Sequence, residues 1–336
     1  MPDPAGAQAT PTRPRWSLRG VADAALFVGY LGAFALCLLT LTAFAGDRHW
    51  LLELTTHFRP HYAAALLTCA IVYAVARRFR SATLLAAFAV LNAAVLAPRF
   101  MPHTASSVAA HAQTPALKLL LVNVLTDNRD HAALLALIEH EQPNVVALLE
   151  VNAEWIAAMA PLANTHPHAH SVPRPDNFGV ALFSRLPLMD PKTVYLGPAE
   201  VPSIRATLPF GHCPVALLAT HPLPPGDAGN LLLRDLHLKA IAKWASASPS
   251  PVIVLGDLNC TPWAPAFRTL LREGNLIDTA RGLSSTWPVT PWWLRIPLDH
   301  CLVSPTFTVT DHRIGPDIGS DHFPVLVTLA LLPAAP

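Results

Sequence analysis

The first hundred residues contain three apolar segments separated by short polar stretches. Residues 21–46 include one charged side chain, Asp23, and neither residues 61–76 nor residues 81–97 include an Asp, Glu, Lys or Arg. A helix of about 20 apolar residues crosses the core of a bilayer, and the middle segment is shorter than that. The pattern predicts three transmembrane helices over residues 21–97, after a tail over residues 1–20. Buried helices of a soluble domain are the alternative.

After residue 97 the pattern changes to shorter apolar runs. Residues 98–116 are rich in Pro, Ser, Ala and His without periodicity, which predicts a linker. Beyond it, apolar β-forming runs predict strands and apolar residues at helical spacing predict helices. The predicted strands are 117–122, 145–149, 180–184, 215–220, 252–255, 298–304 and 319–329, and the predicted helices are 131–141 and 231–247. This order indicates an α/β domain over residues 117–332.

Basic residues orient the predicted anchor. Three arginines lie within residues 13–19, and three more lie within residues 77–80, between the second and third apolar segments. The positive-inside rule places both stretches in the cytoplasm. Three crossings then place the domain outside the cytoplasm, an inference that depends on the short middle segment crossing the bilayer.

Charge and cysteine content narrow the function of the domain. Residues 101–336 contain 14 Lys and Arg and 18 Asp and Glu, a net charge of −4, without a basic cluster. Proteins that grip long nucleic acids carry a basic surface, so nucleic acid is a disfavoured partner. The domain has three cysteines, an odd number without metal-ligand spacing. Buried thiols are expected, and a disulfide between Cys260 and Cys301 is the alternative.

Polar side chains with catalytic chemistry recur at the boundaries of the predicted strands. Asp257 and Asn259 follow the strand at 252–255, and side chains two residues apart point the same way in an extended chain. Buried carboxylates are costly unless they are paired, hydrogen-bonded or bound to metal. The other boundary residues are Asn123, Glu150, His221, Asp299 with His300, and Asp321 with His322. If the strands pack together, these groups converge in one cleft.

The motifs that contain these residues resemble the endonuclease/exonuclease/phosphatase superfamily, which includes DNase I-like nucleases, inositol polyphosphate 5-phosphatases and neutral sphingomyelinases. They are NV at 123, LLEV at 148, FGVALFSRLPL at 178, ATHPLPP at 219, GDLN at 256, LDHCLVS at 298 and GSDHFPV at 319. The resemblance covers about residues 117–329. It implies a four-layered α/β sandwich, in which two packed mixed sheets are flanked by helices, and Mg²⁺- or Mn²⁺-dependent cleavage of a phosphoester.

The predicted anchor in front of such a domain resembles the membrane-anchored bacterial branch of the superfamily. That likeness implies a multi-pass protein of the bacterial cytoplasmic (inner) membrane, acting on lipid-linked cell-wall intermediates. The sequence departs from the pattern of many nucleases of the superfamily at Leu125, where they have an Asp. Asp127 lies two residues further on, and a second metal position is in doubt.

The resemblance also implies roles for the boundary residues. Glu150 would be the principal ligand of a hard cation, with Asn123 as a neutral oxygen ligand or orienting group and Asp321 as a further metal or orienting residue. Asp257 would hold or deprotonate the attacking water. Asn259 would donate a hydrogen bond to a phosphoryl oxygen.

The remaining implied roles concern the phosphate and the leaving group. His322 would lie near the non-bridging oxygens, with Asp299 hydrogen-bonded to its ring. His221 resembles the general acid of DNase I-like members, and the alternative is a structural loop histidine. Asn177 and Arg185 are expected either to contact substrate or to have structural roles.

These observations favour a membrane-anchored metal-dependent phosphoesterase that acts outside the cytoplasm on a phosphorylated lipid, with a polyprenyl pyrophosphate as the first candidate. The alternatives are an extracytoplasmic nuclease and, from another class, a catalytically silent binding module with the same fold. The bilayer and a phosphoester substrate are the expected partners, and no obligate protein partner is inferred.

Overall fold

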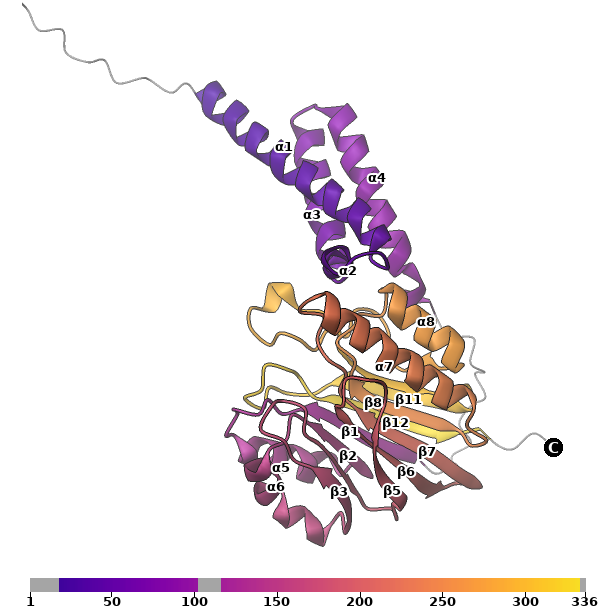
Figure 1. Cartoon of the computed structure of the whole chain (residues 1–336). Helices are drawn as coiled ribbons and strands as arrows, with labels where there is room; N and C mark the ends of the chain where they lie inside the picture. The colour runs from indigo at the N-terminus through magenta and orange to yellow at the C-terminus, as the bar shows by residue number, and fades with distance from the viewer. Residues whose placement is uncertain (1–17, 102–115, 333–336) are drawn as a thin grey trace, which may run out of the picture.

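The computed structural model describes residues 18–101 and 116–332, which form a helical anchor and an α/β domain (Figure 1). The predicted tail lies outside the described residues except for its last few positions, and most of the predicted linker lies outside them as well. The anchor consists of three long helices and a short one. These are α1 (Leu18–Thr42), α2 (Trp50–Thr56), α3 (Arg59–Val75) and α4 (Phe79–Leu96).

The long helices pack side by side, and the short helix α2 lies at the end of the bundle that meets the domain (Figure 1). Leu66 and Tyr73 of α3 and Leu85 of α4 form the buried centre of the bundle. Large apolar side chains on the outside remain exposed, such as Phe34 at 71% and Val75 at 80%. Apolar side chains on the outside of a helical bundle are typical of a surface that faces lipid.

Among the described residues, two helices, not the predicted three, are long and apolar enough to cross a membrane alone. These are Ala24–Ala45 and Phe79–Phe100. Helix α3 has 17 residues, and at 1.5 Å per residue it is only about 26 Å long. It qualifies as a crossing only together with α2, from which it is bent by 64°. The expectation of three independent transmembrane helices is therefore corrected to two helices and one bent pair, because α2 turns aside to pack against the domain.

The domain is built from two six-stranded sheets. The first has the order β11-β12-β1-β2-β4-β3 and the second has the order β5-β6-β7-β8-β10-β9. The strands of the first sheet are β1 (Ala116–Asn123), β2 (Val145–Leu149), β3 (His168–Val172), β4 (Val180–Ser184), β11 (Phe307–Ile314) and β12 (Val325–Leu331). Those of the second are β5 (Met189–Tyr195), β6 (Pro202–Phe210), β7 (Cys213–Thr220), β8 (Val252–Asp257), β9 (Ile277–Asp278) and β10 (Asp299–Val303).

Each sheet is mixed and contains one parallel pair. Strand β1 runs parallel to β2 in the first sheet, and β7 runs parallel to β8 in the second. The other neighbouring strands are antiparallel. Because strands that run the same way end at the same edge of a sheet, each parallel pair brings two strand ends together.

The two sheets pack face to face, and helices cover their outer faces (Figure 1). Along β1, Leu119 and Leu121 face the second sheet, whereas Leu120 and Val122 pack beneath the helices. Burial on both faces explains why such strands read as continuous apolar runs. The covering helices are α5 (His131–Glu141) and α6 (Ala153–Ala158) on the first sheet, and α7 (Ala228–Ser246) and α8 (Pro265–Gly274) on the second. The predicted four-layered sandwich is confirmed.

The central strands were predicted and several others were missed. Strands β3, β5, β6, β9 and β11 were not predicted, because most are sheet-edge strands that are short or carry exposed polar residues. The last strand begins at Val325. Residues 319–324, which were predicted to be its first residues, form a loop in front of it instead. The cysteines are free, with Cys260 and Cys301 buried, so the structure has no disulfide between them.

Candidate active site

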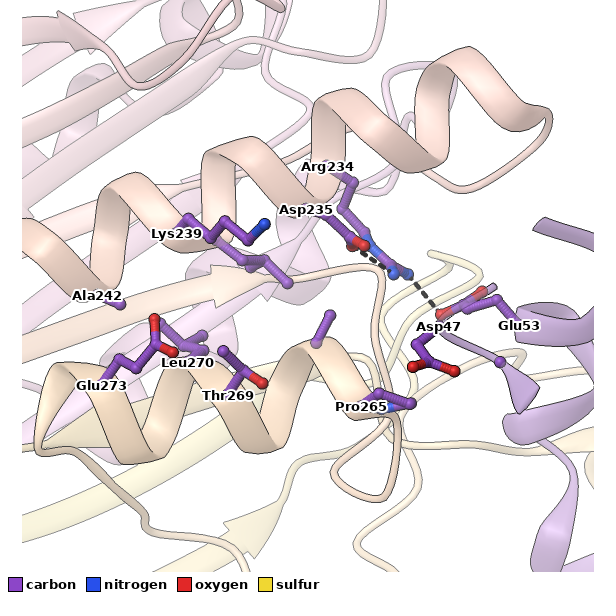
Figure 2. Close-up of a pocket in the computed structure, with 13 residues that line it drawn as sticks. Asp47, Glu53, Arg234, Asp235, Lys239, Ala242, Pro265, Thr269, Leu270 and Glu273 are labelled. Atoms are coloured by element: carbon purple, nitrogen blue, oxygen red, sulfur yellow. Dashed lines mark hydrogen bonds and ion pairs between the residues drawn. The ribbon is translucent and has the colours of Figure 1, made fainter. Parts of the chain in front are cut away.

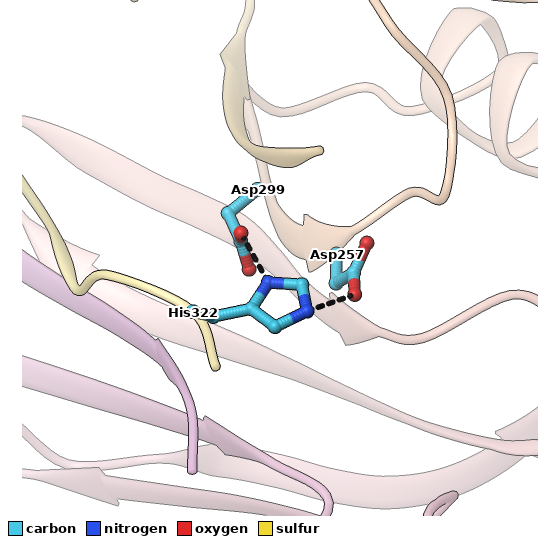
Figure 3. A group of neighbouring side chains, drawn as sticks. All are labelled: Asp257, Asp299 and His322. Atoms are coloured by element: carbon cyan, nitrogen blue, oxygen red, sulfur yellow. Dashed lines mark hydrogen bonds and ion pairs between the residues drawn. The ribbon is translucent and has the colours of Figure 1, made fainter. Parts of the chain in front are cut away.

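The parallel pairs place the predicted boundary residues at one end of the sandwich. Asn123 is the last residue of β1 and lies opposite Leu149 of β2, so Glu150 follows directly beside it. His221 follows β7 in the same way. Asp257 ends β8, and Asp299 of β10 lies directly opposite it in the antiparallel register. The loop before β12 brings His322 to the same place (Figure 3).

Asp257 lies at the centre of this group. Its Oδ2 atom is 3.3 Å from Asn123 Nδ2, 3.4 Å from His221 Nε2 and 3.6 Å from His322 Nε2. Only 2% of the residue is exposed. Burial acts to raise the pKa of Asp257, but His322 and His221 outweigh it and hold the pKa below its usual value. Asp257 is therefore an ionised carboxylate surrounded by donors.

His322 is held between two carboxylates, as Figure 3 shows. Its Nδ1 atom lies 2.7 Å from Asp299 Oδ2. Burial alone would lower the pKa of His322, but the charges of Asp299 and Asp257 raise it to about 10. Asp257, Asp299 and His322 are close enough together to hold a metal ion. An imidazolium has no lone pair for a metal. We therefore interpret this trio as a protonated histidine whose charge is stabilised by the two aspartates, rather than as a metal site.

Glu150 and Asp321 provide a different setting, which suits a cation. Asn123 Nδ2 donates to Glu150 Oε1 at 2.8 Å, and Trp287 Nε1 donates to Asp321 Oδ2 at 3.0 Å. The second oxygen of each carboxylate is buried and has no hydrogen-bond partner among the described residues. Burial raises the pKa of Glu150. The charge of His221 and the hydrogen bond from Asn123 lower it and the charge of Asp257 raises it, but burial is the largest effect and the pKa stays above its usual value. Unpartnered buried carboxylate oxygens are the ligands that a hard divalent cation takes, so each of these two residues could supply one, as could Asp299, whose Oδ1 is also buried and unpartnered among the described residues.

Asn123 itself is oriented as a donor. Its Oδ1 atom accepts a hydrogen bond from the backbone N–H of Leu125 at 3.1 Å, which leaves its amide N–H groups for Glu150 and Asp257. Asn123 thus orients two carboxylates, which agrees with the second of its two predicted roles, and its use as a metal ligand stays a prediction. Asp127 is exposed and does not line the cavity, so it does not replace the Asp that is missing at Leu125.

His221 and Asn259 lie side by side next to Asp257. Asn259 Nδ2 is 3.3 Å from His221 Nε2 and donates to the carbonyl oxygen of Pro222 at 3.0 Å. Burial acts to lower the pKa of His221, but the hydrogen bond and charge of Asp257 raise it above its usual value. His221 can therefore hold a proton in a nearly water-free position.

The loop after β8 differs from the extended chain assumed in the sequence analysis. Asn259 has a φ of +49°, in the left-handed region, and its backbone N–H donates to Asp257 Oδ1 at 2.9 Å. The two side chains share the cavity because of this turn, not because of strand alternation. Glu150 and Asn177 also have positive φ, at 61° and 65°. Such backbone strain in non-glycine residues gathers at functional sites.

Two further predicted residues have different outcomes. Asn177 lines the cavity. Arg185 does not reach it, because it follows the end of β4 that pairs with Val145, at the start of β2, whereas Glu150 follows the other end of β2. Its guanidinium instead contacts Gln142. The expectation that Arg185 contacts substrate is therefore corrected, and its role is structural.

Most of these side chains line a single cavity of about 600 Å³, and Asn123 and Asp299 contact the lining residues from behind. We call the group formed by Asn123, Glu150, His221, Asp257, Asn259, Asp299, Asp321 and His322 the catalytic floor. Other parts of the lining are apolar, and sequence reasoning missed them. They include Phe178, Pro224, Pro225, Trp287, Ile296 and Leu298 of the domain.

The anchor also contributes to this cavity. Leu54 at the end of α2, and His57 and Phe58 at the corner between α2 and α3, line it. We call these three residues the anchor wall. The signal that could have found them is Glu53, an acid inside a mostly apolar region, which requires a buried partner.

The partner of Glu53 is Arg234 of α7, and the pair fastens the anchor to the loop after β8 (Figure 2). Arg234 Nη1 donates to Glu53 Oε1 at 2.8 Å and to the carbonyl oxygen of Asn259 at 3.0 Å. His57 Nδ1 is 3.0 Å from Thr261 Oγ1. The Glu53–Arg234 pair also borders a smaller cavity of about 210 Å³ between α2, α7 and α8, which contains no residue of the catalytic floor.

Comparisons with known proteins agree with this architecture. The family model described as "Endonuclease/Exonuclease/phosphatase family" matches residues 120–322. Among curated proteins, none matches the sequence. Solved structures of similar fold are 14–20% identical, a level at which the likeness shows the fold alone.

Three of these solved structures illustrate the likeness. The endonuclease/exonuclease/phosphatase from Bacteroides vulgatus is 19% identical with a TM-score of 0.55, over 65% of this chain and 99% of that one. The endonuclease/exonuclease/phosphatase from Beutenbergia cavernae is 20% identical with a TM-score of 0.52, over 65% and 72%. The human Nocturnin catalytic domain, solved with a bound sulfate anion, is 18% identical with a TM-score of 0.53, over 65% and 95%.

Proposed function

The chain belongs to the endonuclease/exonuclease/phosphatase family, and from this premise we propose that it is a membrane-anchored, divalent-metal-dependent phosphoesterase. Its substrate is a lipid-linked phosphate ester or pyrophosphate on the extracytoplasmic side of the membrane. One observation carries the proposal: a single cavity joins the catalytic floor of a phosphoesterase to residues of an apolar helical anchor.

Glu150 and Asp321 would hold the metal, since each has a buried carboxylate oxygen without a partner among the described residues. Asn123 orients Glu150 and Asp257 through its amide group. A bound Mg²⁺ or Mn²⁺ supplies charge neutralisation and polarisation of a phosphoryl oxygen. This role suits an anionic reaction centre that resists attack by water.

The chain's own side chains supply the remaining chemistry. Asp257 is ionised and faces the cavity, so it orients the attacking water and accepts its proton. Asn259 donates a hydrogen bond to a phosphoryl oxygen. His322, kept cationic by Asp299, stabilises the negative charge that develops on the phosphoryl group. His221, whose pKa is raised, protonates the leaving oxygen.

A lipid substrate follows from the surroundings of the floor. The cavity lining is largely apolar and includes residues of the anchor, so a bilayer crossed by the anchor would lie near the cavity. The net charge of −4 over residues 101–336 disfavours long polyanions. A polyprenyl pyrophosphate is the first candidate, and a phospholipid headgroup is the second.

The proposed sidedness rests on the direction of the helices. Helices α1 and α4 both run toward the domain, and α3 runs away from it (Figure 1). If α1 and α4 cross the bilayer, then α2 and α3 together return the chain, and the arginines at residues 77–80 lie on the side opposite the domain. A C-terminal alkaline phosphatase fusion should then be active in bacteria, whereas a fluorescent protein that folds only in the cytoplasm should be dark. The reverse pattern would place the domain in the cytoplasm.

The substrate proposal is tested by assaying the full-length chain in mixed micelles. Polyprenyl pyrophosphate, a phospholipid and plasmid DNA are compared at matched metal and salt. We expect hydrolysis of a lipid with Mg²⁺ or Mn²⁺, measured as inorganic phosphate from the pyrophosphate or as the phosphomonoester product from the phospholipid, with no hydrolysis in EDTA and recovery when the metal is restored. If DNA is cleaved more efficiently than every lipid, the protein is a nuclease. If nothing is cleaved with either metal, the domain is a binding module.

A further inference from the structure

Leu54 and Phe58 occupy an unusual position, because they belong to the anchor yet line the active-site cavity. Leu51 of α2 is 52% exposed and lies outside the cavity, while Leu54, one turn later, is partly buried at the cavity. Phe58 follows the helix at the bend that starts α3. The corner therefore presents two apolar side chains to the same space that contains Glu150 and Asp257.

This corner is fixed in place by buried polar contacts. His57 bridges Glu53 and Thr261, with its Nε2 atom 3.1 Å from Glu53 Oε2 and its Nδ1 atom 3.0 Å from Thr261 Oγ1. Trp263 Nε1 donates to the carbonyl oxygen of Thr56 at 2.7 Å. Together with the Glu53–Arg234 pair, these bonds join α2 to the segment that begins at Asn259. The anchor wall is thus part of the rigid frame of the cavity.

The side of the cavity formed by the domain is apolar as well. Trp287 and Ile296 pair at the base of a loop and line the cavity. The tip of this loop, Trp292–Leu294, is exposed, with Trp292 at 69%. The base of the loop is therefore apolar at the cavity, and its tip carries further exposed apolar side chains. A volume of about 600 Å³ lies within the range of sites that hold a small organic group.

We propose that the anchor wall binds the hydrocarbon chain of the substrate next to its scissile phosphate, and that Leu54 and Phe58 determine specificity for long-chain substrates. The proposal deepens the proposed function and rests on it. The phosphate occupies the catalytic floor, and the first part of the chain lies against Leu54, Phe58 and Trp287 before it leaves for the bilayer. Burying each methylene group against such a surface is favourable, whereas a short water-soluble ester gains nothing there.

The test compares two substrates that share a headgroup. The full-length chain in mixed micelles with Mg²⁺ is assayed on a polyprenyl pyrophosphate and on methyl pyrophosphate, which has the same headgroup but no isoprene unit to contact Leu54 or Phe58. For a phospholipid substrate, the pair is the lipid and its deacylated form. Leu54→Ala and Phe58→Ala should each lower kcat/KM on the long-chain substrate about tenfold, the scale of lost contacts in an apolar pocket. The short substrate should be hydrolysed as by the wild type.

Leu51→Ala is the matched control, since it removes the same atoms from the same helix outside the cavity. It should leave both substrates unaffected. If Phe58→Ala unfolds, Phe58→Leu replaces it. Inhibition offers a second readout: a long-chain alkylphosphonate should inhibit the wild type more strongly than methylphosphonate, and Leu54→Ala should reduce that preference.

Two results would overturn the proposal while leaving the proposed function intact. Equal losses on the long and short substrates would make the corner a structural element, and unchanged kcat/KM on both would mean that the chain binds elsewhere. A different result would remove the proposed function itself: a wild-type protein that hydrolyses no lipid phosphate but cleaves DNA. In that case the specificity proposal fails with it.

Discussion

The catalytic floor and the anchor wall share one cavity but come from different parts of the chain. The floor is assembled by the ends of strands such as β8 and β10, where the register places Asp257 opposite Asp299. The wall comes from a short helix and the corner after it, which precede the domain in sequence by more than fifty residues and reach it only through tertiary contacts. The floor is charged and specific in its hydrogen bonds, whereas the wall contacts the cavity mainly through the apolar side chains of Leu54 and Phe58.

This difference assigns the chemical reaction to the floor and the recognition of the substrate's chain to the wall. The floor has groups that hold a cation, activate water and move protons, and these would act on any phosphoester that reaches them. The wall offers no side chain for these steps, because its only polar one, His57, is hydrogen-bonded to Glu53 and Thr261. Changes in the floor should therefore affect every substrate, and changes in the wall should affect only substrates with a long chain.

The largest effect is expected from the floor. Glu150→Gln and Asp257→Asn should each lower kcat/KM at least about a hundredfold on long and short substrates alike, the scale of losing a general base. The double variant should lose little more than either single one, because the groups act as a unit. Steady-state phosphate release measures this effect, and circular dichroism should show an intact fold. Asp127→Asn is the matched control, since Asp127 is exposed and outside the cavity. Near-normal activity of Asp257→Asn would remove Asp257 from the mechanism.

Much of the floor could be predicted from sequence, because its residues adjoin strands whose ends the chain pattern reveals. Buried central strands read as unbroken apolar runs, so Glu150, His221 and Asp257 stood out as polar groups where such runs stop. Arg185 was misplaced for the same reason, since it also follows an apolar strand but at the opposite end of the sheet. The sequence does not give the direction of each strand in the sheet, so it does not show which strand ends lie at the same edge.

The wall could not be predicted, because it depends on how the anchor docks. Residues 61–76 are apolar enough to suggest a third independent crossing, yet α3 is short and sharply bent from α2. What the sequence did contain was an acid, Glu53, without an evident partner. Its partner Arg234 lies in a helix whose pattern gives no sign that a guanidinium is buried, and only the structure joins the two.

A smaller effect is expected from the link between wall and floor. Glu53→Gln removes the charged acceptor of Arg234, whose Nη1 atom also holds the carbonyl oxygen of Asn259. The Asn259 side chain should then be less well positioned. We expect turnover to fall about tenfold on both substrates, equivalent to ~1.4 kcal/mol in the activation free energy. An unchanged KM for the short substrate would show that the variant slows the reaction itself and does not weaken substrate binding.

The control for Glu53→Gln is the second buried ion pair between anchor and domain. Arg99, just after α4, donates through Nη1 to Asp278 of β9 at 2.6 Å, and neither residue lines the active-site cavity. Asp278→Asn and Glu53→Gln should both lower Tm, since each breaks an ion pair between anchor and domain, but Asp278→Asn should leave turnover within about twofold of the wild type. Equal losses of turnover in the two variants would mean that docking of the anchor as a whole, rather than the bond to Asn259, supports catalysis.

The pH dependence of Tm checks that Asp278 contributes through its charge. Burial acts to raise the pKa of Asp278, but Arg99 and His300 outweigh it and hold the pKa well below its usual value. A carboxyl group whose pKa is depressed by folding stabilises the protein above its unfolded pKa, about 3.9, and loses this contribution as the pH falls further. The difference in Tm between the wild type and Asp278→Asn should thus be largest near neutral pH and narrow below about pH 4. A difference that stays constant down to pH 3 would show that the variant acts through altered packing, and Asp278→Asn would then no longer serve as the charge-matched control for Glu53→Gln.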